Sequence, residues 1–575
     1  MRCLIPAILA SLIQLSAQQA ILPIGQVKPD MAGVARTVFR GQDPEEFPLR
    51  ILGVLQNSGP GQNIILARLL TARLEQTGVM QGMSGSPVYI DGKLVGAIAF
   101  AFPFAKEPIA GIRPIEEMLQ VERSSGSVRA ERVHLGSTEL VASRSQSETN
   151  QPSPVLTPIS FAGMTERTAR HFAVQWRELG FVLQQGASGS QPSGASSPLR
   201  PGDMISVQLI RGDMNSGADG TVTPIAGNQV YAFGHRFLGG GAVEFPFAKA
   251  EVITSMPNLN MPFKISQSLK PMGAILFDGD AAVKGELGRV PKMVPILIRY
   301  RDAAGLKEYR MEMVRHSLLS PLLLQMALFS TLDSNFRSAG SGTVDLKGEI
   351  RFVGQAKPLE IEGRYSGDNN LPAAASLGAA IPFAFFQQHV EETLLPESMT
   401  FDLVANIKHE QWVIESASAS RRSAKPGDTL TIRTQLSSPN GVEKIVEHQF
   451  TVPSWLPGGE TLTFTVADSF ITNLLDFRSF YQPGGPVFRS TAELIRTLGT
   501  LHPANGMYVR VFRSSPAFQS GGRELSNLPP SIATTLQKTP GTYLPIYQSR
   551  LFDRETRLAD GVVSGSRTFT LEIEK

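Results

Sequence analysis

Short runs rich in Val, Ile, Leu and Phe, separated by Gly and Pro, make up residues 21–120. Runs of this kind between turn residues predict β-strands. This first block is therefore predicted to be one β-rich domain. We place its strands at 35–38, 49–55, 63–70, 88–90 and 94–100, and a short helix at 116–120.

The strand pattern is interrupted after this block and then returns. Residues 121–200 are rich in Ser, Gln, Gly and Pro. We interpret them as a partly disordered connector with one helical stretch at 165–179. A second strand-rich block covers 201–300, so the chain is predicted to have two β-domains joined by a connector.

The remainder of the chain changes character once more. Residues 301–400 form a mixed α/β region, with predicted helices at 318–332 and 373–389. Short strands with Pro-Gly turns then predict a β-sandwich over 401–575. The strands of this C-terminal block are expected at 429–436, 447–452 and 461–466. The expected fold class is mainly β.

Residues 1–20 have the pattern of a secretory signal peptide. Met1 and Arg2 begin it, residues 4–15 are apolar, and Leu15-Ser16-Ala17 offers a small-residue cleavage site. The apolar stretch is too short to span a bilayer, and no other segment approaches about 18 uninterrupted apolar residues. We expect an exported protein, periplasmic or secreted, with no stable membrane insertion after signal removal. An uncleaved membrane anchor is the alternative.

Composition excludes several classes of function. The single cysteine, Cys3, lies inside the predicted signal, so a mature chain would have no disulfide, no thiol catalysis and no cysteine-ligated zinc. The eight histidines show no metal-binding spacing, and we expect no metal and no cofactor. A net charge of +3 without basic runs argues against a nucleic-acid partner.

One segment recurs within the chain. Residues 85–98 can be laid over residues 220–233 without a gap, with Gly, a hydroxyl residue, Ile, Gly, Val and Ala in common. Each copy predicts a β-hairpin, with its turn at Asp91-Gly92 or Gly227-Asn228. A chance match is conceivable because hairpins share turn chemistry. Two copies in two strand-rich blocks nevertheless favour a duplicated six-stranded barrel.

The first hairpin follows a Gly/Ser loop, Gln81 to Pro87, that has the chemistry of a nucleophile turn. Ser84 is the candidate nucleophile, with the N–H groups of Gly82 and Ser84 as the oxyanion hole. Gly82 and Gly85 permit the tight backbone path, because other residues resist positive φ. A loop that merely turns the chain is the competing interpretation.

The second hairpin ends in Phe233-Gly234-His235, and His235 is the candidate general base. In a two-barrel serine protease, one barrel carries the base just after this hairpin and the other carries the nucleophile before its counterpart. Here the barrels have the opposite chain order, which is acceptable because catalytic triads are defined by geometry. A histidine packed for structural reasons is the alternative.

The third catalytic residue should orient the imidazole, and it lies between the fifth and sixth strands in such a barrel. The strands after the histidine are predicted at 243–253, 263–277 and 281–287. The turn between the last two contains Asp278, our first choice, and Asp280, our second. A solvated Asp-Gly turn competes with both, and Asp213 and Asp219 fit less well.

The segment from Gln81 to Pro87, with Gly92 to Ala97 and Ile115 to Leu119, resembles the SpoIVB peptidase family of bacteria. Residues 220–235 resemble the histidine-bearing half of that family, in reversed order. The resemblance implies a trypsin-like double β-barrel, serine endopeptidase activity on proteins or peptides, and self-cleavage. The acid expected upstream of the serine is missing from 69–72, so either Asp278 replaces it or the site is a dyad.

Three functions are consistent with this sequence. The first is an active exported endopeptidase with acyl-enzyme chemistry at Ser84 and His235. The second is a catalytically silent double barrel that binds proteins or glycans at the cell surface or in the periplasm. The third is a protein that processes only its own chain.

Overall fold

The computed structural model describes four long ranges of the chain. Residues 1–18 of the predicted signal, with Cys3, lie outside the described residues, as does most of the Ser/Gln/Gly-rich stretch near residue 190. The ranges are 19–124, 153–186, 197–478 and 501–575, with short gaps at 60, 103–104, 156, 259–261, 337–341, 368–369, 389–394, 409, 516, 521–522, 526–527, 539–543, 547 and 559–560.

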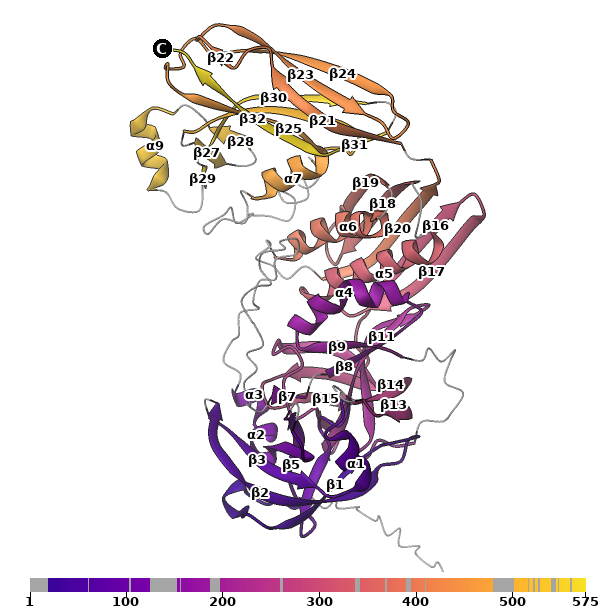
Figure 1. The fold of residues 1–575 in the computed structure, drawn as a ribbon. Helices are drawn as coiled ribbons and strands as arrows, with labels where there is room; N and C mark the ends of the chain where they lie inside the picture. The colour runs from indigo at the N-terminus through magenta and orange to yellow at the C-terminus, as the bar shows by residue number, and fades with distance from the viewer. Residues whose placement is uncertain are drawn as a thin grey trace, which may run out of the picture.

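The first β-domain is a closed barrel of six strands (Figure 1, indigo). Its strands pair in the ring order β1-β2-β3-β6-β5-β4, and β4 returns to β1. Alternate side chains of β2, among them Phe47, Leu49 and Ile51, are buried in the barrel core, as a strand period of two requires. The six strands are β1 (Ala32–Thr37), β2 (Glu45–Gly59), β3 (Gln62–Leu69), β4 (Pro87–Ile90), β5 (Lys93–Ala101) and β6 (Ile109–Pro114).

The second β-domain closes in the same way. Its pairings run β10-β11-β12-β15-β14-β13 and back to β10, so the two barrels have one ring order, first-second-third-sixth-fifth-fourth. The mainly β double barrel expected from the sequence is therefore confirmed. The strands are β10 (Met204–Gly212), β11 (Asn215–Ala226), β12 (Gln229–Ala232), β13 (Gly241–Met256), β14 (Phe263–Asp278) and β15 (Val283–Leu287).

The two recurring segments are both hairpins, one in each barrel, but they are not equivalent strands. Residues 85–98 contain β4 and most of β5, the fourth and fifth strands, whereas 220–233 contain part of β11 and all of β12, the second and third. Pro87 pairs with Ala97 as Val222 pairs with Ala232, yet the second turn is displaced by one residue. The sequence repeat therefore reflects the turn chemistry that hairpins share. What the two barrels have in common is the order in which their strands pair around the ring.

Four short elements lie beside or between the barrels. The connection from β3 to β4 contains α1 (Ala72–Thr77), and β6 leads into α2 (Ile115–Leu119) and α3 (Val121–Ser124). Val121 is buried with Tyr231 and Ala282 of the second barrel. Beyond residue 152, β7 (Ser153–Pro154) pairs with β5 of the first barrel.

The range that we interpreted as a connector contributes more structure than expected. The predicted helix is present as α4 (Glu166–Glu178), and two unpredicted parallel strands flank it, β8 (Thr157–Ala162) and β9 (Phe181–Gln185). Pairing of β8 with β11 adds this unit to the sheet of the second barrel. Trp176 and Phe181 are buried there in edge-to-face contact.

The mixed α/β region continues the same sheet. Residue 300 lies inside a strand of this region, so the sheet crosses the boundary that we placed there. The hairpin β16 (Val294–Asp302) and β17 (Gly305–Met313) joins β10, and both predicted helices are found, α5 (Leu319–Asn335) and α6 (Leu371–Gln388). The other strands are β18 (Gly342–Phe352), β19 (Leu359–Gly367) and β20 (Pro396–Asn406).

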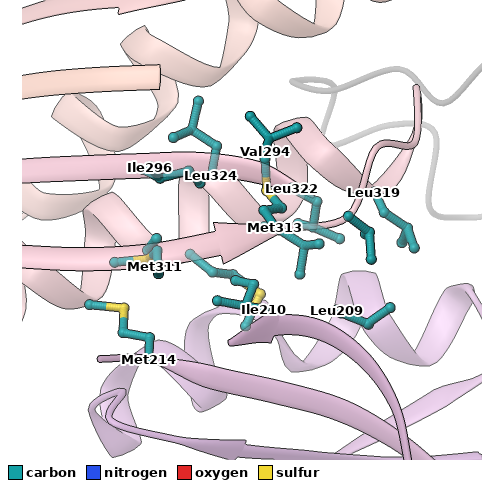
Figure 2. Close-up of a cluster of buried hydrophobic side chains, with 14 of the residues drawn as sticks. Leu209, Ile210, Met214, Val294, Ile296, Met311, Met313, Leu319, Leu322 and Leu324 are labelled. Atoms are coloured by element: carbon teal, nitrogen blue, oxygen red, sulfur yellow. The ribbon is translucent and has the colours of Figure 1, made fainter. Parts of the chain in front are cut away.

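Apolar side chains fill the junction between the second barrel and this region. Figure 2 shows the side chains of β10 facing those of β17 and the start of α5 across the junction. Burial of these side chains makes the barrel and the α/β region one hydrophobic core. The residues labelled there are Leu209, Ile210, Met214, Val294, Ile296, Met311, Met313, Leu319, Leu322 and Leu324.

The C-terminal block is built from two main sheets around a separate core, as the sandwich prediction requires (Figure 1, orange and yellow). Among the described residues, no helix combines the length and apolar character needed to cross a membrane. The elements are β21 (Gln411–Ala419), β22 (Ser423–Ala424), β23 (Thr429–Ser437), β24 (Glu443–Thr451), β25 (Thr461–Asp468), α7 (Ser469–Arg478), β26 (Gly506–Arg513), β27 (Ala517–Ser520), β28 (Arg523–Leu525), α9 (Pro530–Gln537), β29 (Leu544–Ile546), β30 (Ser549–Arg557), β31 (Val562–Ser564) and β32 (Ser566–Ile573).

The shared core gives the first testable prediction. Met313 of β17 is fully buried and pairs with Ile210 of the second barrel. We expect Met313→Ala to lower the free energy of unfolding by about 2–5 kcal/mol, because it removes buried methylene groups and leaves a cavity. Leu306→Ala on the same strand is the control, since Leu306 is 49% exposed and should change stability by less than about 0.5 kcal/mol. Equal losses in urea titrations would contradict the shared core.

Candidate active site

Ser84 lies in the connection between the third and fourth strands of the first barrel. Gly82 and Gly85 have φ of 88° and 92°, so both adopt the left-handed backbone that the sequence predicted for them. Among the hydrogen bonds of the described residues, the N–H groups of Gly82 and Ser84 have no acceptor. The backbone thus leaves free the two donors that we assigned to an oxyanion hole.

The second barrel holds this loop through its strand β11. The Thr221 N–H donates to the Ser84 carbonyl at 2.8 Å, and the Thr221 hydroxyl donates to the Gly82 carbonyl at 2.9 Å. The Thr223 hydroxyl donates to the Gly85 carbonyl at 2.6 Å. Three of the loop's carbonyl groups therefore find their donors in the other barrel. These two threonines were not identified from the sequence.

His235 occupies the corresponding connection of the second barrel, between its third and fourth strands. It follows Phe233 and Gly234, which both have left-handed backbones with φ of 69° and 70°. Its Nδ1 lies 2.8 Å from the Arg236 carbonyl oxygen. Because a carbonyl only accepts, Nδ1 carries the proton and Nε2 is the accepting nitrogen. This is the tautomer that a general base acting on a serine requires.

The surroundings of His235 favour the neutral ring. Burial lowers its pKa from the ordinary value of 6.5 to about 4, and the positive charges of Arg113 and Arg236 act in the same direction. Arg113 also donates from Nε to the Gly234 carbonyl at 3.4 Å and pairs with Glu117 at 2.9 Å. Sequence reasoning did not find Arg113, because its role depends on a contact between barrels.

Ser84 and His235 enter one seam between the barrels. The Gly85 N–H donates to the Ile98 carbonyl at 2.7 Å, and a Cβ added to Gly234 would lie 3.4 Å from the same oxygen. Gly85, which follows Ser84, and Gly234, which precedes His235, therefore both lie next to the Ile98 carbonyl oxygen. No hydrogen bond joins Ser84 Oγ to His235 Nε2; both atoms are buried and lack a partner among the described residues.

Asp278 lies at the end of the fifth strand of the second barrel, as the barrel topology predicted, but it does not contact the imidazole. Its carboxylate instead accepts four backbone N–H groups, and His235 Nδ1 is bonded to the Arg236 carbonyl. Burial raises the pKa of Asp278, and the backbone donors oppose that rise. Asp280 is exposed. The four N–H donors, 2.6–3.3 Å from the carboxylate oxygens, belong to Phe237, Leu238, Gly239 and Gly240.

Neither Ser84 nor His235 lines the cleft found between the second barrel and the α/β region. Within the described ranges, no group of three or more His, Cys, Asp or Glu side chains is placed to hold a metal ion. The cleft, of about 680 Å³, lies between β10, β14 and the α/β region, lined in part by Arg211, Lys270 and Arg310. Ser84 and His235 are 0% and 4% exposed, so the seam is closed in this structure.

The docking of the Ser84 loop can be tested at Gly85. A Cβ at this position would lie 2.0 Å from the Thr221 carbonyl oxygen and 2.5 Å from the Phe233 nitrogen, both backbone atoms. We expect Gly85→Ala to lower the free energy of unfolding by about 4 kcal/mol or more, because both strain and a clash result. Gly92→Ala is the control: its φ is 74° but nothing lies within 4 Å, so it should cost about 1 kcal/mol. Similar losses in denaturant titrations would refute this docking.

The buried imidazole predicts a pH-dependent stability. Because the pKa of His235 is about 4 when folded and near 6.5 when unfolded, the unfolded chain binds the extra proton between these values. Stability contributed by the neutral ring is therefore present above pH 6.5 and lost as the pH falls toward 4. We expect unfolding free energies of the wild type to fall by about 3 kcal/mol more than those of His235→Gln between pH 7 and pH 4. His316, whose pKa is also about 4, remains in both proteins and cancels. Parallel pH curves would contradict the burial.

Comparison with known proteins bears on the first barrel. A family model described as SpoIVB peptidase S55 matches residues 10–119, which include the Ser84 loop and all six strands of that barrel. The match ends before the second barrel and His235. No curated protein and no solved structure matches the chain significantly. Residues 10–119, which contain the first barrel, therefore match a SpoIVB peptidase S55 domain, and this match supports a serine peptidase.

Proposed function

We propose that the protein is an exported serine endopeptidase in which Ser84 is the nucleophile and His235 the general base. The observation that carries the proposal is the interlock between the Ser84 loop and β11, the strand that leads through β12 to His235. The N-terminal pattern of residues 1–20 supports export. The order of the halves, serine before histidine, is part of the proposal.

The proposed mechanism uses the groups between the barrels that have no hydrogen-bond partner among the described residues. Ser84 Oγ attacks the carbonyl carbon of a peptide bond while His235 Nε2 accepts the hydroxyl proton. The N–H groups of Gly82 and Ser84 stabilise the oxyanion. The imidazolium then gives its proton to the leaving amine, and water releases the acyl group by the reverse steps. The Arg236 carbonyl orients the ring, and Asp278 fixes the following loop.

The closed seam favours self-processing as a second candidate function. Ser84 and His235 are both buried, so a substrate reaches them only after the barrels or their loops separate. A segment of the same chain is present at high effective concentration whenever the seam opens. A separate protein substrate has to bind in competition with that segment while the seam is open. A silent binding protein is the third function, and it requires no reactive serine.

Labelling with a fluorophosphonate separates these functions. We expect the purified mature protein to be labelled, and Ser84→Ala to abolish labelling and to lower turnover by about 10⁶ if the site acts as a unit. Ser86→Ala is the matched control, because Ser86 is also buried and unpaired but directly precedes β4. Labelling that survives Ser84→Ala and disappears in Ser86→Ala would reverse the assignment. An unlabelled wild type would favour the binding protein, and cleavage of an added unfolded protein would separate general from self-directed activity.

A further inference from the structure

Lys264 is a fully buried lysine of the second barrel whose hydrogen-bond partners belong to the first. It lies on β14, and its Nζ donates to the Thr37 hydroxyl at 2.7 Å and to the Gly82 carbonyl at 3.3 Å. Placing an ammonium group in the interior is costly unless it is well bonded. An apolar side chain at this position would avoid that desolvation cost. The presence of a lysine therefore indicates that a donor to the Gly82 carbonyl is needed here.

The Gly82 carbonyl is held from two sides. The Thr221 hydroxyl donates to it at 2.9 Å, and Lys264 Nζ is the second donor. The aliphatic part of the lysine lies under the glycine, because a Cβ at Gly82 would be 3.4 Å from Lys264 Cδ. The Gly82 carbonyl belongs to the peptide group that joins Gly82 to Met83. The N–H of that peptide group, on Met83, donates to the Met80 carbonyl at 3.0 Å. This peptide is therefore fixed at both ends.

The position of this peptide matters for the proposed chemistry. It lies between the two N–H groups assigned to the oxyanion hole, those of Gly82 and Ser84. Rotation of the central peptide would turn its neighbours and redirect both N–H groups. The direction of both donors consequently depends on what holds the Gly82 carbonyl.

We propose that Lys264 is a positioning residue of the proposed peptidase, holding the Gly82 carbonyl from the second barrel so that the Gly82 and Ser84 N–H groups converge on the oxyanion. The inference rests on the proposed function. It makes the oxyanion hole of the first barrel dependent on the barrel that also supplies the base.

The charge of Lys264 is sensitive to pH near neutrality. Burial lowers its pKa to about 7, and the negative charges of Asp219 on β11 and Glu45 on β2 oppose that fall. The Thr37 hydroxyl and the ring of Phe39, whose centroid is 6.0 Å from Nζ, also lie next to the ammonium group. The side chain is therefore cationic below about pH 7 and neutral above it. A cationic donor binds a carbonyl more strongly than a neutral one, so the reaction of Ser84 should slow as the pH rises through this range.

Replacement of the lysine tests the proposal. We expect Lys264→Met to lower the rate of fluorophosphonate labelling and kcat for a peptide about 10²–10³-fold, with little change in KM, as for the loss of an oxyanion donor. The decrease in wild-type labelling rate near pH 7 should disappear in the variant. Lys249→Met is the matched control: Lys249 is a buried lysine of the adjacent strand β13, but it pairs with Asp203 at 2.8 Å and does not contact the Ser84 loop. Its labelling rate should stay at the wild-type value.

Each outcome decides between the two proposals. If the wild type is not labelled, the proposed function and this inference fail together. If the wild type is labelled and Lys264→Met reacts at the same rate with an unchanged pH profile, only the role of Lys264 is refuted. Should Lys264→Met not fold, Lys264→Gln takes its place, because it keeps an N–H donor without the charge. An unchanged fall near pH 7 in that variant would likewise refute the inference.

Discussion

The hydrogen bonds from Thr221 and Thr223 to the Ser84 loop are the interaction on which the rest of this structure depends. The loop is neither helix nor strand, so its carbonyl groups have no regular partners, and a buried carbonyl without a donor costs about 1–3 kcal/mol. Strand β11 supplies those donors from the other barrel. The loop can therefore hold this shape only while the barrels are docked, and the approach of β11 is why position 85 has no room for a side chain.

Much of this arrangement could be predicted from the sequence because it follows from local chemistry. The left-handed backbones of Gly82 and Gly85 and the hairpin turns are properties of a few adjacent residues. Five of the six strands of the first barrel could likewise be placed from short apolar runs between turn residues, whereas β6 was not among the predicted strands. The placement of Asp278 next to the turn between the fifth and sixth strands also agrees with the structure, where it is the last residue of β14, because the ring order of the barrel fixes that turn.

What could not be predicted depends on contacts between distant parts of the chain. Thr221, Arg113 and Lys264 have ordinary sequence surroundings, and only the docked barrels bring them to the loops of Ser84 and His235. The partner of Asp278 was also missed, because four free N–H groups compete with an imidazole for one buried carboxylate. The repeat of residues 85–98 at 220–233 wrongly suggested equivalent hairpins in the two barrels. The error arose because hairpins at different places in a barrel share the same turn residues.

The two segments that flank residues 125–152 each contact one of the barrels. Val121 is buried against the second barrel, and Lys284 lies 3.0 Å from Glu122, whereas Pro154 pairs with Phe100 of the first barrel. None of the hydrogen bonds between the Ser84 loop and β11 requires a continuous peptide between these anchors. A chain cut once between the barrels would thus remain a single folded particle of two polypeptides, with serine and histidine on separate fragments.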